Sequence, residues 1–127
     1  MLDEAKNRQE DFKKIFNSLL KKHHCNGKAP TLSTVITETI MSGAPSYYVG
    51  YDHARRTLSL YRRGLLPKNY NRLRRKMIAE IAHKIDRINR KKGIHAEGEA
   101  LTRVLAEGKA SRFFISPQSA LRIIYKH

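Results

Sequence analysis

The stretch APSYYVGYDHARRTL, residues 44–58, has a counterpart near the C-terminus, ASRFFISPQSALRII, residues 110–124. Without gaps, the two share an aromatic pair, a β-branched residue, a small residue where a helix can start, an alanine four positions later and an arginine two further on. With one gap the match extends backwards, so the internal pseudo-repeat covers residues 36–58 and 101–124. Such self-similarity predicts one supersecondary unit used twice: helix, glycine stop, extended aromatic stretch, helix. Chance similarity is the alternative.

In the second copy, Ser116 is the predicted N-cap and Pro117 the first helical residue, because proline lacks the N–H that this position leaves unbonded. The aromatic stretches, residues 47–49 and 113–115, are candidates for pairing as a tiny two-stranded sheet. This pairing would be the one β element in an otherwise helical chain.

The rest of the chain repeats apolar residues three or four positions apart, the spacing of one helix face. Asn26-Gly27 and Gly43 are predicted helix stops, and Thr31 or Ser33 is a predicted N-cap. The predicted helices cover residues 2–24, 31–42, 51–63, 71–92 and 97–107, with another from residue 117. The sequence therefore predicts an all-α fold, a single-domain bundle of about five or six helices over residues 1–127.

Basic residues are concentrated in the middle of the chain. Of 26 Lys and Arg residues, 14 fall within residues 51–92, against three acidic residues, so this stretch carries +11 of the net +15. Such a concentration repels itself in the folded state, which favours a polyanionic partner and above all nucleic acid. Arginine outnumbers lysine there by nine to five, which favours planar recognition of phosphate or guanine.

Helical periodicity places these charges opposite the apolar faces of the helices at residues 51–63 and 71–92. The predicted nucleic-acid-binding residues are Arg55, Arg56, Arg62, Arg63, Arg72, Arg75, Lys76, Arg87, Arg90, Lys91 and Lys92. The alternative is a solvated face with local ion pairs, because Glu80 lies four residues from both Lys76 and Lys84 and Asp86 lies four before Arg90.

The aromatic pairs have two interpretations. Tyr47 and Tyr48 are candidates for stacking on unpaired bases, and Phe113 and Phe114 share their position in the repeat. Aromatic pairs at element boundaries are more often core, and we expect at least one of each pair to be buried. Adjacent tyrosines also serve as nucleophiles in DNA-nicking enzymes, but the sequence lacks the His-x-His constellation of their metal site.

Catalytic and metal-binding patterns are weak. His23-His24-Cys25 lacks a second ligand pair at zinc spacing, so no metal site is predicted. No Ser, His and Asp arrangement and no phosphate-cradling glycine loop is recognisable. We therefore expect a protein that is not an enzyme and has neither a cofactor nor a small-molecule substrate.

The cellular setting follows from cysteine use and hydropathy. A single cysteine, Cys25, excludes an internal disulfide framework and suits a reducing compartment. The first residues lack the features of a secretory signal, and no apolar run approaches the roughly 20 residues that span a bilayer. A cytoplasmic protein without a membrane partner is expected.

Two helices separated by Gly43, the second rich in arginine, invite comparison with helix-turn-helix proteins. The connection from Gly43 to Gly50 is about eight residues, longer than the three or four of that turn, so the resemblance is weak.

The favoured function is binding of duplex DNA, in a regulatory or an accessory, architectural role. One rival is an RNA-binding protein of a ribonucleoprotein. The other is an interaction module that docks an acidic protein, in which the repeated unit forms a homodimer surface.

Overall fold

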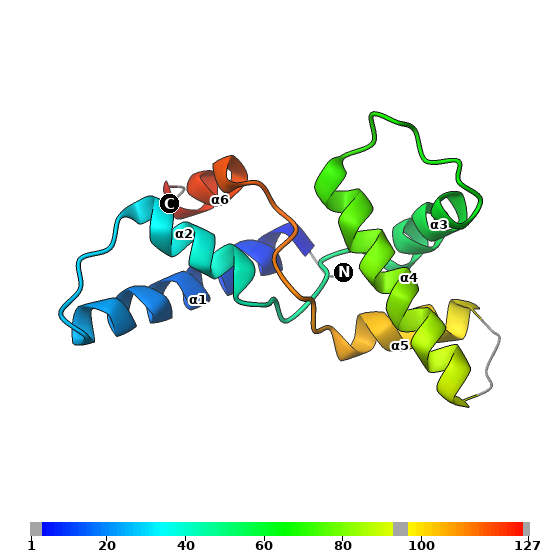
Figure 1. Ribbon diagram of the computed structural model, residues 1–127, viewed down its shortest axis with the longest axis horizontal. Coiled ribbons are helices and arrows are strands. Elements are labelled where there is room, and N and C mark those ends of the chain that lie inside the picture. The colour runs from blue at the N-terminus through cyan, green and yellow to red at the C-terminus, as the bar shows by residue number, and fades with distance from the viewer. Residues whose placement is uncertain (1–3, 93–96, 126–127) are drawn as a thin grey trace. The chain divides into compact units, whose positions relative to one another are not determined.

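The computed structural model describes residues 4–92 and 97–125, which form six α-helices and no strand (Figure 1). The helices are α1 (Glu4–Cys25), α2 (Leu32–Met41), α3 (Tyr51–Arg62), α4 (Arg72–Lys92), α5 (Glu97–Glu107) and α6 (Pro117–Tyr125). The predicted all-α fold is therefore confirmed. The predicted start of the first helix at Leu2 lies outside the described residues.

Side chains that bond to backbone N–H groups determine where three helices begin. The Thr31 hydroxyl accepts a bond from the Thr34 N–H at 3.2 Å, and the Ser116 hydroxyl accepts one from the Ser119 N–H at 3.1 Å, as expected for N-caps. Asn71 caps α4, because its side-chain oxygen accepts the N–H groups of the second and third residues of the helix at 3.0 and 3.1 Å. These bonds satisfy donors that have no partner within the helix.

Glycines in the left-handed region determine two helix ends. Gly27 has φ 70°, and its N–H bonds to the carbonyl of His24 while the Lys28 N–H bonds to that of His23. Gly64, with φ 68°, ends α3 with the same two-bond pattern, a Schellman motif. A side chain at either glycine would strain the backbone, because L-residues rarely adopt positive φ.

The chain groups into two compact units. Unit 1 consists of Met1–Tyr48 with Lys109–His127, and unit 2 is the continuous segment Val49–Gly108. Each copy of the pseudo-repeat therefore contributes one helix to each unit: α2 and α6 belong to unit 1, and α3 and α5 to unit 2. That residues 1–127 form a single helical domain stays a prediction.

Unit 1 packs α1, α2 and α6 against one another. Its core includes Phe12, Val35 and Phe113, each at most 1% exposed. The Phe12 and Phe113 rings meet edge to face with centroids 5.2 Å apart, a favoured aromatic geometry. Thr39 is also fully buried, and its hydroxyl donates to the Val35 carbonyl at 2.7 Å, so it leaves no unpaired polar group.

The two repeat copies meet at one antiparallel bridge in unit 1. The Ala44 N–H donates to the Ala110 carbonyl at 3.0 Å, and the Ala110 N–H donates to the Ala44 carbonyl at 2.8 Å. Beyond the bridge, side chains make the contact, because the rings of Tyr47 and Phe114 stack at 6.4 Å and those of Tyr48 and Phe113 at 6.0 Å. The contacts are reciprocal in repeat register, as a pseudo-two-fold relation requires.

The expected two-stranded sheet between residues 47–49 and 113–115 is wrong. Tyr48 has φ 56°, which places it in the left-handed region and interrupts an extended run. The Phe113 N–H is also already used, because it donates to the Ile40 carbonyl at 2.9 Å. The backbone pairing is therefore limited to the Ala44 and Ala110 bridge.

Unit 2 packs α3, α4 and α5 against one another. The buried residues come from the predicted apolar faces and include Leu58 of α3, Ile81 and Ile85 of α4, and Leu101 of α5, each at most 1% exposed. The opposite faces of α3 and α4 are left to solvent, and they carry the basic residues.

Replacing Phe113 with alanine should destabilise the protein by roughly 3 to 5 kcal/mol, because the change leaves a cavity against Phe12 and removes a ring that stacks on Tyr48. Urea unfolding followed by circular dichroism measures this. Tyr125→Ala is the control, since that ring is 64% exposed and its loss should cost under about 0.5 kcal/mol. Equal costs for the two variants would contradict the assigned core.

Candidate nucleic-acid interface

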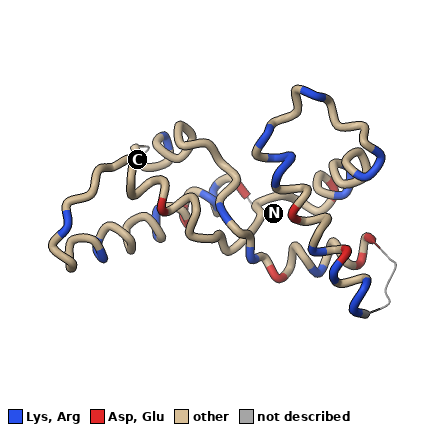
Figure 2. The backbone as a smooth tube through the Cα atoms, viewed as in Figure 1, with Lys and Arg blue, Asp and Glu red and all other residues tan. Residues whose placement is uncertain are grey.

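Unit 2 carries most of the excess positive charge. Residues 49–108 contain 15 Lys and Arg against six Asp and Glu. No acidic residue lies between Asp52 and Glu80, a run that contains nine Lys and Arg residues. Figure 2 shows these residues in blue along α3, the connecting loop and α4. Because charges of one sign are adjacent here, the local potential is strongly positive.

Helix α4 presents four of its cations in a row. The α4 stripe, defined here as Arg72, Lys76, Arg87 and Arg90, consists of exposed side chains on the face opposite the buried Ile81 and Ile85. At 100° per residue the four fall within about 60° of one another, and at 1.5 Å per residue the row is about 27 Å long. Lys91 is exposed beside it, whereas the Lys92 side chain lies outside the described part of the chain.

Helix α3 and its C-cap residue add three exposed arginines. Arg56 lies on the solvent side of α3, and Arg63 is the C-cap. The guanidinium of Arg55 lies 6.0 Å from the Tyr51 ring and donates to the Tyr51 hydroxyl at 3.1 Å. The Arg63 side chain donates to the Ser59 carbonyl at 3.4 Å. Within the part of the chain that the structure describes, none of the three forms an ion pair with a carboxylate.

Arg62 differs from its neighbours, because it pairs with acidic residues of both other helices in unit 2. Its guanidinium donates two bonds to Asp86 of α4, at 2.7 and 3.1 Å, and one to Glu97 of α5, at 2.8 Å. The bond from Arg62 lowers the pKa of Asp86, and the bond to Asp86 raises the pKa of Arg62. Arg62 therefore belongs to a structural network, and we leave it out of the residues proposed below to contact phosphates.

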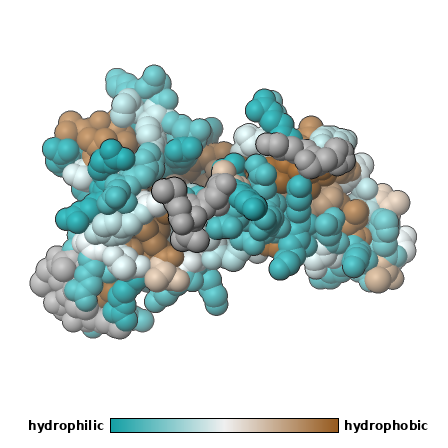
Figure 3. Space-filling view, turned by 180° about the vertical axis from the view of Figure 1, so that it is seen from behind, coloured by the Kyte–Doolittle hydropathy of each residue, from teal (hydrophilic) through white to brown (hydrophobic). Residues whose placement is uncertain are grey.

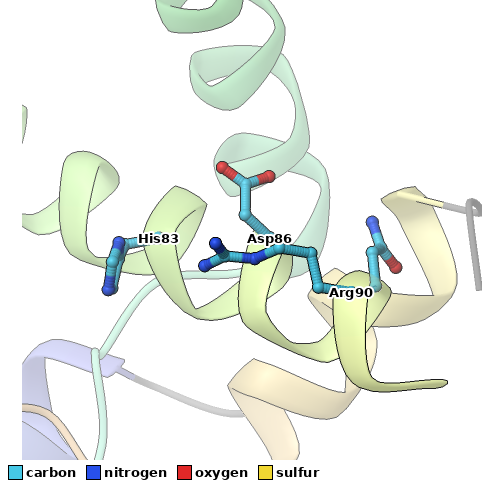
Figure 4. Close-up of a pocket in the computed structure, with 4 residues that line it drawn as sticks. His83, Asp86 and Arg90 are labelled. Carbon is cyan, nitrogen blue, oxygen red and sulfur yellow. The ribbon is translucent and has the colours of Figure 1, made fainter. Parts of the chain in front are cut away.

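This network also corrects the expected pairing of Asp86. The sequence predicts an ion pair with Arg90, four residues later on the same helix. The carboxylate points toward α3 instead, as Figure 4 shows, while Arg90 extends along α4 in the direction of His83. Of the Glu80 pairs considered, the one with Lys84 is present, with the two charged atoms 4.0 Å apart.

A hollow of about 640 Å³ lies beside the C-terminal half of the α4 stripe. His83, Asp86, Asn89 and Arg90 line it (Figure 4). Because Arg62 bonds to both oxygens of Asp86, His83 and Arg90 are the basic groups that this surface offers to solvent. The hollow therefore extends the positive surface of α4 instead of interrupting it.

Arg75 lies apart from the stripe. Its side chain is half-buried, donates to the Pro67 carbonyl and lies 6.0 Å over the Tyr70 ring. These contacts connect α4 to the loop that precedes it. The position of Arg75 on the helix predicts a phosphate contact, but helix position alone does not reveal its bond to the Pro67 carbonyl.

The two candidate stacking tyrosines lie in unit 1 and are already engaged. Tyr47 is 5% exposed and stacks on Phe114. Tyr48 stacks on Phe113 and donates its hydroxyl proton to Asp11 at 2.6 Å. Burial, followed by the bond to Asp11, raises the pKa of Tyr48 above its ordinary value. We do not include these rings in the interface, because Tyr47 is buried and the half-buried Tyr48 is already in contact with Phe113 and Asp11.

Within residues 4–92 and 97–125, no group of three or more His, Cys, Asp and Glu side chains could hold a metal ion. His23 instead bonds to Glu38 at 2.9 Å, and Cys25 is exposed. In the same residues no helix has the length and apolar character needed to cross a membrane.

Comparison with protein-family models, curated proteins and solved structures finds no match to this chain.

Replacing Arg62 with methionine should lower stability at pH 7 by about 1 kcal/mol, or about 3 to 5 °C in melting temperature, because a partly exposed ion-pair network is lost. The folded pKa of Asp86 lies below its ordinary value of 3.8, so this contribution exists above that pH and disappears as the pH falls through the folded pKa.

The melting temperatures of wild type and Arg62→Met should therefore converge as the pH falls below the ordinary pKa of Asp86, 3.8, and through its lower folded pKa. Thermal unfolding at several pH values tests this, with Arg56→Met as the matched control on the same helix. If the two melting temperatures are equal at pH 7, or if their difference persists unchanged at pH 2, the role assigned to the network is contradicted.

Proposed function

We propose that this chain is a non-enzymatic protein that binds duplex DNA by contacting phosphates with the α4 stripe, with Arg55 and Arg56 of α3 and with Arg63 at the C-cap of α3. The main support is the row of four exposed cations on one face of α4. Neutralising phosphates with such side chains releases condensed counterions, which supplies sequence-independent affinity. A regulatory or an architectural role would use the same contacts.

The dimensions of the stripe suit a duplex. Its length of about 27 Å exceeds the major-groove width of about 12 Å, so one straight helix can approach phosphates on both edges of a groove. Planar arginine side chains hold phosphate oxygens with two parallel bonds, and three of the four stripe residues are arginine. The stripe therefore supports binding that positions the protein on DNA without requiring base contacts.

Burial of the aromatic rings favours a duplex over a single strand. Proteins that hold single strands stack bases on exposed rings. The tyrosines of unit 2, Tyr51, Tyr61 and Tyr70, are all half-buried, and arginines lie over two of them. Phosphate contact thus accounts for this surface better than base stacking. Structured RNA and an acidic protein are the alternative ligands that the test below distinguishes.

Reversing three stripe residues together, Arg72→Glu, Lys76→Glu and Arg87→Glu, should weaken duplex binding by more than about 100-fold, because three phosphate contacts are replaced by repulsion. The slope of log K against log salt should fall by about three. Fluorescence anisotropy with a labelled duplex measures both quantities, and circular dichroism checks that the helices remain.

The matched control reverses three exposed lysines of α1, Lys14→Glu, Lys21→Glu and Lys22→Glu, which changes the net charge by the same amount. This α1 variant should weaken duplex binding far less and should keep most of the slope of log K against log salt. Equal losses for both triple variants would show that net charge, not the α4 stripe, governs binding. Wild-type binding to structured RNA or to an acidic protein, but not to duplex DNA, would replace the proposal.

A further inference from the structure

The loop that joins α3 to α4, residues 63–71, lies at the centre of the acid-free run and exposes a leucine. Leu65 is 57% exposed. Figure 3 shows hydrophobic residues as brown areas among teal hydrophilic ones on one face of the molecule. Among the described residues, the exposed large hydrophobic side chains are Leu32, Met41, Leu65, Leu121 and Tyr125, and of these Leu65 is the one in unit 2.

Hydrogen bonds hold the backbone of this loop on both sides of the leucine. The Leu65 N–H donates to the Leu60 carbonyl at 2.8 Å, and the Tyr70 N–H donates to the Pro67 carbonyl at 3.0 Å. Arg75 donates to the same Pro67 carbonyl, which connects the turn to α4. In a Schellman motif the residue at the Leu65 position usually packs onto the helix that it ends. The Leu65 side chain is instead exposed to solvent, although its own N–H is hydrogen-bonded to α3.

The surroundings of Leu65 are positively charged. Arg63 and Lys68 lie on either side of it in the loop, and both side chains are exposed. An apolar side chain held between cations matches the chemistry by which minor-groove proteins insert a wedge between base steps while cations hold the adjacent phosphates. An acidic protein would also pair with these cations. An apolar side chain between the cations suits DNA better, because neighbouring base pairs can separate to admit it.

We propose that residues 63–71 form a minor-groove loop in which Leu65 inserts between two base pairs and kinks the duplex. This inference rests on the proposed function and adds the groove and the deformation to it. Leu65 partly unstacks one base step, Arg63 and Lys68 contact the phosphates beside it, and Arg75 is a positioning residue that holds the turn. The preferred ligand is therefore DNA that is easily bent or already kinked.

The test uses the full-length protein with a duplex labelled at its two ends for energy transfer, together with a duplex that contains a two-nucleotide bulge. Wild type should shorten the end-to-end distance of the linear duplex and bind the bulged duplex about tenfold more tightly, because the bulge removes most of the unstacking cost. Leu65→Ala should lose the bending and the preference while keeping the salt slope. Leu65→Met should retain both.

Met41→Ala is the control, because Met41 is 56% exposed but lies in unit 1. It should bend DNA as wild type does. If wild type binds the linear duplex with a salt slope but does not bend it, or if Leu65→Ala bends it equally, the wedge is overturned and the proposed function stands. If wild type binds neither duplex, the wedge and the proposed function are both overturned.

Discussion

Two reciprocal hydrogen bonds between Ala44 and Ala110 connect parts of unit 1 that are 66 residues apart in the chain. Between them runs the whole of unit 2, so the bridge joins the segment that follows α2 to the segment that leads to α6. The stacked pairs of Tyr47 with Phe114 and Tyr48 with Phe113 reinforce it with apolar contact. The bridge and these rings add to the packing of α6 against α1 and α2, and together these contacts offset the chain entropy that closing so long a loop costs.

In unit 2 the arginines fall into two groups: Arg62 pairs with acidic residues within the fold, and the exposed arginines are the ones proposed to contact phosphates. Arg62 of α3 donates hydrogen bonds to Asp86 of α4 and Glu97 of α5, and so connects the three helices of unit 2. The cations of the α4 stripe stay exposed, and they lie along a helix whose opposite face is core. Their mutual repulsion disfavours the free protein, and a polyanion that binds the folded state would stabilise it by mass action.

The parts of this structure that could be predicted from sequence depend on residues close together in the chain, and the parts that could not depend on how the helices pack. The helix starts at Leu32 and Pro117 follow from the caps Thr31 and Ser116, which act within three residues, and the all-α fold follows from apolar spacing. The pairing of Arg62 with Asp86 could not be predicted, because it depends on how α3 packs against α4. The sheet prediction was wrong because the positive φ of Tyr48 has no sequence signal such as glycine.

DNA binding is tested most directly by the affinity of the unmodified chain for a duplex DNA across a salt series, measured beside single-stranded DNA and structured RNA of equal length. We expect the duplex to bind most tightly, with log K falling linearly on log salt at a slope that corresponds to about four or more phosphate contacts. Weak binding to all three near 0.15 M salt would contradict it and would direct attention to an acidic protein partner.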